Sequence, residues 1–199
     1  MPDAVTTPAA TTPTVTAPTP NQMQKQIIKN KAVVGDDWTV LRLAEGESAD
    51  GVAIPAGKVI VPLTVWQAQA AALQLRAAAG ELGVWFASDE RPEALTGEVA
   101  KFAVIAVDFP KFSDGRGYSI AYNLRARLGY TGELRAIGDV LRDQMFYMQR
   151  VGFDAFEPRA DRNIHDALKG LSDFSEQYQT SWDQKSPLFR RVQRTGVAQ

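Results

Sequence analysis

The chain has 199 residues, of which 45% are hydrophobic and 23% are charged, as in an ordinary globular protein with a sizeable core. Its formal net charge of -1 argues against nucleic acid or an anionic membrane as the main partner. The absence of cysteine and the single histidine, His165, exclude disulfides, thiolate nucleophiles and cofactors held by Cys or by several His side chains. No apolar run is long enough to span a bilayer and no secretory signal is recognisable, so a cytoplasmic location is expected.

The composition divides the chain into three parts. Residues 1–23 are rich in Thr, Pro and Ala and contain no aromatic residue. Such a segment buries too little apolar surface to offset its ordering entropy, so we predict a disordered tail. Residues 24–182 form the predicted single α/β domain. Residues 183–199 form a C-terminal segment in which Leu188, Phe189 and Val192 alternate with arginines; it either docks on a larger acidic partner or folds back on its own domain.

The first predicted elements are short strands. Four apolar or alternating runs are separated by turn signals, which predicts an N-terminal β-meander. These runs are Gln26–Ala32, Trp38–Leu43, Val52–Ile54 and Val59–Val61.

Helical periodicity begins at Pro62. One apolar stripe predicts a helix that ends near Gly80, with Thr64 and Gln67 at the spacing of a capping box. The stripe consists of Leu63, Trp66, Ala70, Leu73 and Ala77.

Strands and helices then alternate. The predicted strands are Val84–Ala87, Phe102–Val107, Leu134–Ile137 and Phe153–Phe156, and the predicted helical segments are Pro92–Leu95, Tyr118–Leu128, Val140–Val151 and Arg162–Tyr178. Three glycines, Gly83, Gly129 and Gly152, are predicted to end helices in the left-handed conformation. This repetition of βα units predicts a mostly parallel sheet with right-handed crossovers. An open sheet is the first choice and a partial β/α barrel is the second.

Charged residues follow the predicted strand ends, where parallel α/β sheets bind their ligands. Because arginine forks and helix N-termini bind oxyanions, these residues predict a site for a small oxyanion or phosphorylated ligand. The predicted ligand-binding residues are Lys111, Asp114, Arg116, Arg142, Glu157 and Arg159, with Asp108 or Asp139 as candidate catalytic base. The competing interpretation treats Ser113, Asp114, Asp139 and Asp161 as helix caps and the arginines as their surface partners.

Two more specific sites are disfavoured. Gly115-Arg116-Gly117 resembles the start of a dinucleotide fingerprint, but the loop before it is long and Ile120 occupies the third glycine position. A magnesium site made by Asp108, Asp139 and Glu157 rests only on analogy with barrel enzymes, and no metal site is predicted. His165 is expected on the surface, and Met145 and Met148 are expected in the core.

Several stretches together carry a family resemblance. They are "IPAGKVIVPLTVW", "GVWFASDERPEAL", "FAVIAVDFPKFSDGRGYSIAYNLR" and "GELRAIGDVLRDQMFYMQRVGFDAFEPR". Over roughly residues 37–182 the chain resembles a bacterial family of unknown function whose members are labelled as predicted oxidoreductases, probably involved in sulfite reduction. The resemblance carries no catalytic residues over to this chain.

Two functional hypotheses follow. The resemblance implies an accessory protein that binds sulfite reductase or its electron donor. The charged strand ends favour instead an enzyme or sensor, an oxidoreductase if the family label applies, that binds a small oxyanion. The sequence does not identify a cofactor. It offers no Cys or His ligands for one, but a flavin bound mainly by backbone groups would not require a recognisable sequence motif.

Overall fold

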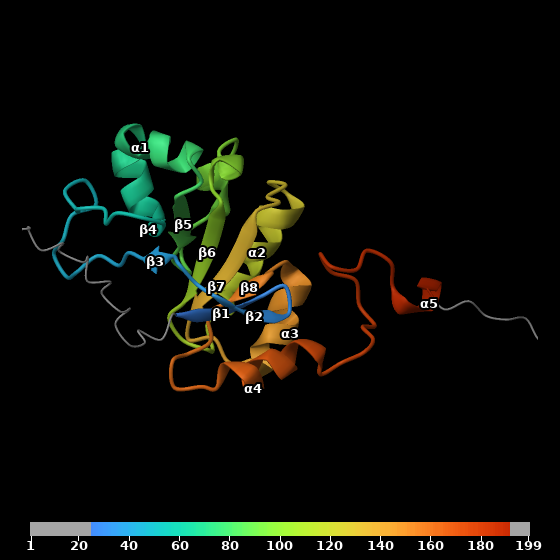
Figure 1. Ribbon diagram of the computed structural model, residues 1–199. Coiled ribbons are helices and arrows are strands. Elements are labelled where there is room, and N and C mark those ends of the chain that lie inside the picture. The colour runs from blue at the N-terminus through green and yellow to red at the C-terminus, as the bar shows by residue number, and fades with distance from the viewer. Residues whose placement is uncertain (1–24, 192–199) are drawn as a thin grey trace, which may run out of the picture.

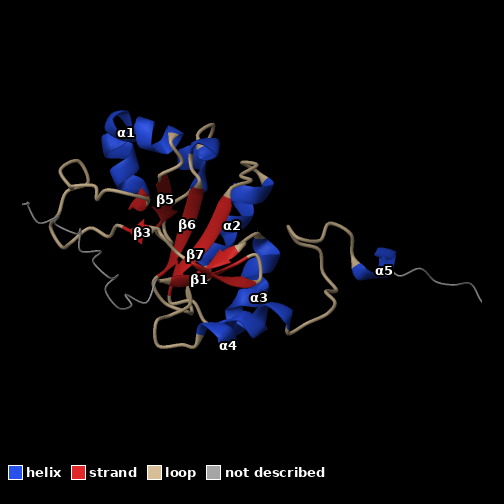
Figure 2. Ribbon diagram, viewed as in Figure 1, coloured by secondary structure: helices blue, strands red, loops and turns tan. Residues whose placement is uncertain are grey.

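A computed structural model describes residues 25–191, which form an eight-stranded sheet with helices packed against it (Figures 1 and 2). The strands are β1 (Gln26–Lys29), β2 (Ala32–Gly35), β3 (Thr39–Val40), β4 (Val59–Pro62), β5 (Leu82–Phe86), β6 (Val104–Phe109), β7 (Glu133–Gly138) and β8 (Ala155–Phe156). The α-helices are α1 (Leu63–Ala78), α2 (Arg116–Ala126), α3 (Arg142–Val151), α4 (Ile164–Lys169) and α5 (Leu188–Arg191). Short 3-10 helices occupy Pro92–Leu95, Val99–Lys101 and Gly170–Ser172.

Six strands, β3 to β8, are parallel and lie side by side in chain order. Helices α1, α2 and α3 connect β4 to β5, β6 to β7 and β7 to β8. Because successive crossovers have the same hand, strands in chain order place these helices on one face of the sheet. The predicted α/β class and the mostly parallel sheet are therefore confirmed.

The N-terminal hairpin extends this sheet at the β8 end. β1 pairs antiparallel with β2 and with β8, and the turn between β1 and β2 consists of Asn30 and Lys31, whose φ angles are 51° and 63°. Two residues with positive φ form the hairpin turn whose twist matches that of the strands. The predicted meander is thus confirmed in part: β1 and β2 form a hairpin, while β3 and β4 join the parallel sheet.

The sheet is curled into a half-barrel. β2 and β3 lie at opposite edges of the sheet, yet only residues 36–38 separate Gly35 from Thr39. A flat eight-stranded sheet would place these edges about 34 Å apart, whereas four residue steps of chain reach at most about 14 Å. The short connection therefore requires a strongly curved sheet, and of the two predicted architectures the partial barrel is the one observed.

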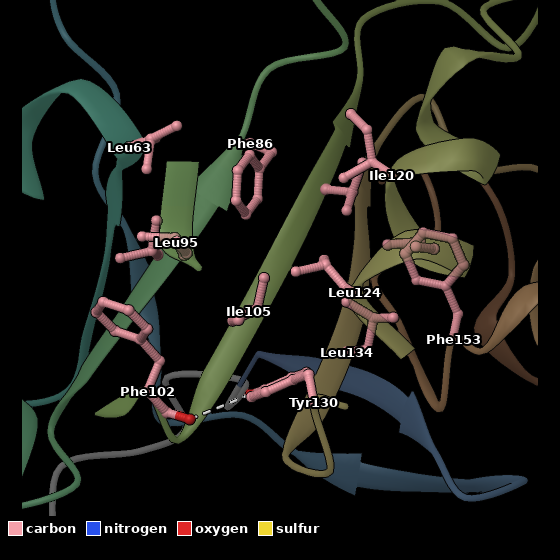
Figure 3. Packing of buried hydrophobic residues seen from close by; sticks show 14 of the residues in the cluster. Leu63, Phe86, Leu95, Phe102, Ile105, Ile120, Leu124, Tyr130, Leu134 and Phe153 are labelled. Atoms are coloured by element: carbon pink, nitrogen blue, oxygen red, sulfur yellow. Dashed lines mark hydrogen bonds between the residues drawn. The ribbon is translucent and has the colours of Figure 1, made fainter. Parts of the chain in front are cut away.

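The main core lies between the convex face of the sheet and the helices. Aliphatic and aromatic side chains from the strands, α1 and α2 interdigitate there (Figure 3). The buried Tyr130 hydroxyl donates to the carbonyls of Phe102 and Glu133, at 3.2 and 3.0 Å, so its polar atom is satisfied inside this core. A smaller cluster on the concave face contains Trp38, which the connection between β2 and β3 brings over the sheet.

Several local predictions are confirmed and others are wrong. The stripe of α1, the helical turn at Pro92–Leu95, the exposed His165 and the buried methionines of α3 are observed. The capping box is wrong, since α1 begins at Leu63 with no side-chain cap. The predicted strand Val52–Ile54 is not a strand; instead, the Val52 carbonyl accepts a hydrogen bond from Gln69 of α1.

Two glycines and one helix also differ from expectation. Gly83 lies inside β5, where an added Cβ would approach the Val104 carbonyl oxygen to 2.7 Å, whereas Gly129 and Gly152 have positive φ as predicted. The helix predicted over Arg162–Tyr178 ends at Lys169 and is followed by a 3-10 turn. The apolar periodicity that predicted the longer helix continues to Phe174 and Tyr178, but these side chains are exposed and do not pack on the sheet.

No helix among residues 25–191 is both long and apolar enough to cross a bilayer. The predicted tail of residues 1–23, together with Val192 and the residues after it, lies outside the described part of the chain.

Candidate functional site

The candidate site is the rim formed by the carboxyl ends of the parallel strands. Asp108 lies near the end of β6, Asp139 directly follows β7, and Glu157 directly follows β8. Since these strands are adjacent and parallel, the three carboxylates lie along one edge of the sheet. This is the edge at which β/α barrels carry their active sites.

Asp108 is paired with an arginine that the sequence analysis did not single out. The Arg42 Nη2 atom lies 2.7 Å from Asp108 Oδ1, and the Arg42 guanidinium lies 5.2 Å from the centre of the Trp85 ring. This ion pair raises the pKa of Arg42. Arg42 follows β3, and no local pattern connects it with β6, which is why sequence reasoning missed it.

Asp139 is held by Arg159 and by a backbone amide. Arg159 Nη1 lies 2.9 Å from Asp139 Oδ1, and the rest of its fork contacts Asp161 at 2.6 and 3.0 Å. Hydrogen bonds to Asp161 and Asp139 raise the pKa of Arg159. The second carboxylate oxygen of Asp139 accepts from the Phe112 amide at 2.9 Å. These contacts tie together the loops that follow β6, β7 and β8.

The carboxylates predicted as helix caps have different outcomes. α3 has Leu141 at its N-cap and α4 has Asn163, so neither Asp139 nor Asp161 caps a helix. Asp114 does accept a hydrogen bond from the amide of Arg116, the first residue of α2, at 3.1 Å, so the predicted cap contact is observed there. Asp139 and Asp161 are held by Arg159 instead.

The remaining predicted arginines have their own partners. Arg116 forms a two-point contact with Asp114 and donates to the Ser88 hydroxyl at 2.8 Å. Its guanidinium holds the pKa of Asp114 well below the usual range. Arg142 points toward α4 and the turn after it, where it pairs with Asp166 and Asp173.

Lys111 and Glu157 complete the predicted set. Lys111 is exposed and has no ion pair within residues 25–191, whereas Glu157 pairs with Lys25 at 2.8 Å. The predicted residues therefore lie along the rim, and all of them except Lys111 form separate ion pairs. Arg116 lines a hollow of about 470 Å³ beside the β5 loop, and Arg142 lines another of about 420 Å³ between α3 and α4. Arg116 and Arg142 thus line different hollows of the described part of the chain, and the roles of the predicted residues in binding stay predictions.

The arrangement offers no evident metal centre. Within the described residues, no group of three His, Cys, Asp or Glu side chains is placed to hold a metal ion. Asp108, Asp139 and Glu157 each face a basic side chain instead.

A chain of alternating charges crosses the concave face below the rim. Arg135 of β7 is 1% exposed and pairs with Glu133 at 2.6 Å and with Asp36 at 2.9 Å. Lys29 contacts Glu133 at 2.7 Å, and Lys25 contacts Asp36 at 3.3 Å. The network therefore links the hairpin and the connection after it to β7 on the concave face of the sheet.

A different surface is formed by the C-terminal arm, which we define as residues 174–191. In Figure 1 its outer part, with α5, extends away from the sheet and its helices. Three of its aromatic side chains, Phe174, Tyr178 and Phe189, are 64%, 71% and 63% exposed. The sequence left open whether the C-terminal segment folds back on its own domain or docks on a partner. Phe189 is exposed, so it does not fold back on the domain.

The arm is nevertheless anchored to α3. Arg150 of α3 contacts Asp183 at 3.3 Å and donates to the Gln179 carbonyl, while Arg191 and Glu176 pair at 3.2 Å within the arm itself. Phe174 packs edge to face against Phe146 of α3, with ring centres 4.9 Å apart. The exposed aromatic residues therefore belong to a segment that one ion pair and one ring contact hold against α3.

The fold and the rim define a half-barrel of βα units that ends in a projecting aromatic arm. Residues 83–189 match a family described as "Bacterial protein of unknown function (DUF934)", and the chain belongs to this family. The match runs from β5 to the outer part of the arm, which includes most of the rim. No curated protein and no solved structure matches the chain.

Proposed function

We propose that this protein is an accessory protein of sulfite reduction that binds sulfite reductase or its electron donor through the C-terminal arm. The sulfite connection comes from the family resemblance of the sequence. The single observation that favours a binding role is the exposure of Phe174, Tyr178 and Phe189 on an anchored segment. Large aromatic side chains and arginines are enriched among the residues that dominate protein interfaces.

The charges of the arm indicate the kind of surface it would meet. Arg190 carries no ion pair within the described residues, and its guanidinium lies 5.8 Å from the Phe189 ring centre. A partner surface with an apolar pocket surrounded by carboxylates would accept both groups. Charge of this kind mainly increases the association rate, while the buried aromatic ring supplies most of the affinity.

The test is a binding measurement with purified sulfite reductase and, separately, its electron donor from the same organism. We expect Phe189→Ser to weaken binding by about 30-fold, the effect of losing one dominant interface residue. Leu75→Ser is the matched control, because Leu75 is 85% exposed but lies on α1, away from the arm. The proposal is rejected if neither protein binds and deletion of the gene leaves sulfite-dependent growth intact.

A second candidate function is an enzyme or sensor that binds a small oxyanion at the rim. It is favoured by Lys111, an exposed ammonium group next to the loop whose Phe112 amide contacts Asp139. In this proposal Lys111, Arg116, Arg142 and Arg159 bind the anion, with Asp114 and Glu157 nearby and Asp108 or Asp139 as base. Sulfite, sulfate and phosphate titrations test it: unchanged binding after neutralisation of all four basic groups would reject it. A visible flavin absorption band in the purified protein would favour redox chemistry within this second candidate.

A further inference from the structure

A separate hollow of about 530 Å³ lies between helices α2 and α3 and the inner part of the arm. α2 contributes residues on successive turns, α3 contributes Tyr147 and Val151, and the arm contributes Thr180, Ser181 and Lys185. A volume of this size falls within the range of small-molecule sites. The hollow lies on the helical side of the sheet and shares no lining residue with the predicted rim site.

Aromatic rings form one part of its wall. Tyr118 and Tyr147 pack edge to face with ring centres 5.2 Å apart, and Tyr122 follows Tyr118 by one helical turn. Tyr122 and Tyr147 remain 40% and 56% exposed. Tyrosine faces that remain open in this way can stack on a flat ring, and such stacking is tolerant of the ring's identity.

Basic groups form the other part. Arg127 and Lys185 both line the hollow, and neither forms an ion pair with any described residue. In contrast, the rim arginines Arg116, Arg142 and Arg159 each face at least one carboxylate. The residues that line the hollow include no Asp or Glu, so the charge of its two basic groups is not neutralised at the wall.

Neutral polar groups complete the lining. Ser119, Asn123, Thr180 and Ser181 contribute hydroxyl and amide groups. Burial, with smaller contributions from Asp143 and Tyr147, raises the pKa of Tyr118, so its hydroxyl stays protonated and can donate. Hydrogen-bond donors beside guanidinium and ammonium groups are the usual recognition set for phosphate and sulfonate.

We propose that this hollow binds a small aromatic anion, that is, a flat ring that carries a phosphate or sulfonate group. The ring stacks on the tyrosines, and the anionic group binds Arg127 and Lys185. The hollow and the proposed partner surface share the arm but use different side chains of it, because Phe174, Tyr178 and Phe189 do not line the hollow.

Phenyl phosphate and adenosine monophosphate are suitable probes, measured by calorimetry with the full chain. Phenol and inorganic phosphate are the controls that carry only the ring or only the anion. We expect phenyl phosphate to bind at least about tenfold more tightly than either control, since each part of the hollow contributes separately. Trp182 supplies a second signal, because the Lys185 ammonium lies 4.5 Å from its ring centre and its fluorescence should change when Lys185 engages an anion.

The variants separate a specific site from general charge attraction. Arg127→Gln with Lys185→Gln should weaken phenyl phosphate by about tenfold or more, and Tyr122→Ala should weaken it by about tenfold through lost stacking. Lys31→Gln with Arg91→Gln removes the same net charge from exposed positions outside the hollow and should leave binding unchanged. All replaced side chains are exposed, and unchanged thermal melting verifies that the variants fold.

The proposal is overturned if neither aromatic anion binds, if inorganic phosphate binds as tightly as phenyl phosphate, or if the two charge-matched pairs weaken binding equally. Binding to sulfite reductase is measured in parallel on the same variants. If phenyl phosphate does not bind while sulfite reductase does, this site fails and the proposed function stands. If phenyl phosphate binds while sulfite reductase does not, the proposed function fails and this site stands.

Discussion

Replacement of Arg135 tests how much the buried ion-pair network stabilises the curved sheet. The guanidinium is 1% exposed and contacts two buried carboxylates, with Glu133 at 2.6 Å and Asp36 at 2.9 Å. Arg135→Met keeps much of the side-chain volume but leaves both carboxylates facing each other without the central cation. We therefore expect the free energy of unfolding to fall by about 3–5 kcal/mol, the usual cost of removing one partner of a buried ion pair.

Urea denaturation at neutral pH measures this change. With a denaturant dependence of about 2 kcal/mol/M for a domain of this size, the midpoint should fall by about 2 M. Arg127→Met is the matched control: Arg127 is exposed and has no carboxylate partner among the described residues, so its loss should change stability by less than about 0.5 kcal/mol.

A triple variant distinguishes loss of a cation from loss of packing. Arg135→Met combined with Asp36→Asn and Glu133→Gln leaves no uncompensated charge in the network, so it should cost less stability than Arg135→Met alone. Lys25 keeps its contact with Glu157, and Lys29 loses its contact with Glu133 but is only partly buried, so these changes cost only about 0–1 kcal/mol. The reasoning is refuted if Arg135→Met costs less than about 1 kcal/mol, or if the triple variant is as unstable as the single one.

Two further predictions concern the rim loops. Gly138 has φ 91°, and an added Cβ would approach the Phe109 carbonyl oxygen to 2.5 Å, so Gly138→Ala should destabilise the protein by about 3 kcal/mol. The control is Gly46→Ala, at φ 80° with open space around it, which should cost about 1 kcal/mol. Equal shifts of the two variants in thermal melting would contradict this prediction. Burial raises the pKa of the Glu90 carboxyl above its ordinary value of 4.5, so the folded state binds more protons than the unfolded state just above that pH and stability should decrease as pH rises through this window. Glu90→Gln should reduce that decrease in urea titrations at several pH values, and an unchanged slope would show that other groups cause it.

The parts of the fold that sequence reasoning predicted are those set by local chemistry. The apolar stripe of α1, the positive φ of Gly129 and Gly152, and the buried strands β5 to β8 depend on neighbouring residues along the chain. Alternation of strands and helices then fixes the parallel arrangement, because crossovers have one hand.

The curvature of the sheet could not be predicted in the same way. It depends on the pairing of β1 with β8 and on the short connection that carries Trp38 over the concave face. Neither feature leaves a local signal: the hairpin turn is Asn30-Lys31, not a glycine-containing pair, and Arg135 lies in the sequence as one charged residue within a strand.

The candidate site shows the same limit. Parallel strand ends correctly place the predicted rim residues along one edge. Their partners come from distant segments, as with Arg42 for Asp108 and Asp166 for Arg142, so the separate ion pairs were not foreseeable. The tyrosine-lined hollow was missed because it requires the arm to return beside α2 and α3.

The pairing of β1 with β8 also affects how the protein is made. Ile28 leaves the ribosome early, but the strand residue opposite it, Phe156, follows only after all the other strands have been synthesised. The hairpin must therefore wait with an unpaired edge while the intervening βα units emerge, and exposed strand edges of this kind promote association between chains. A nascent chain of this protein is consequently expected to be most vulnerable to aggregation just before β8 appears, and chaperone binding during translation should peak at that stage.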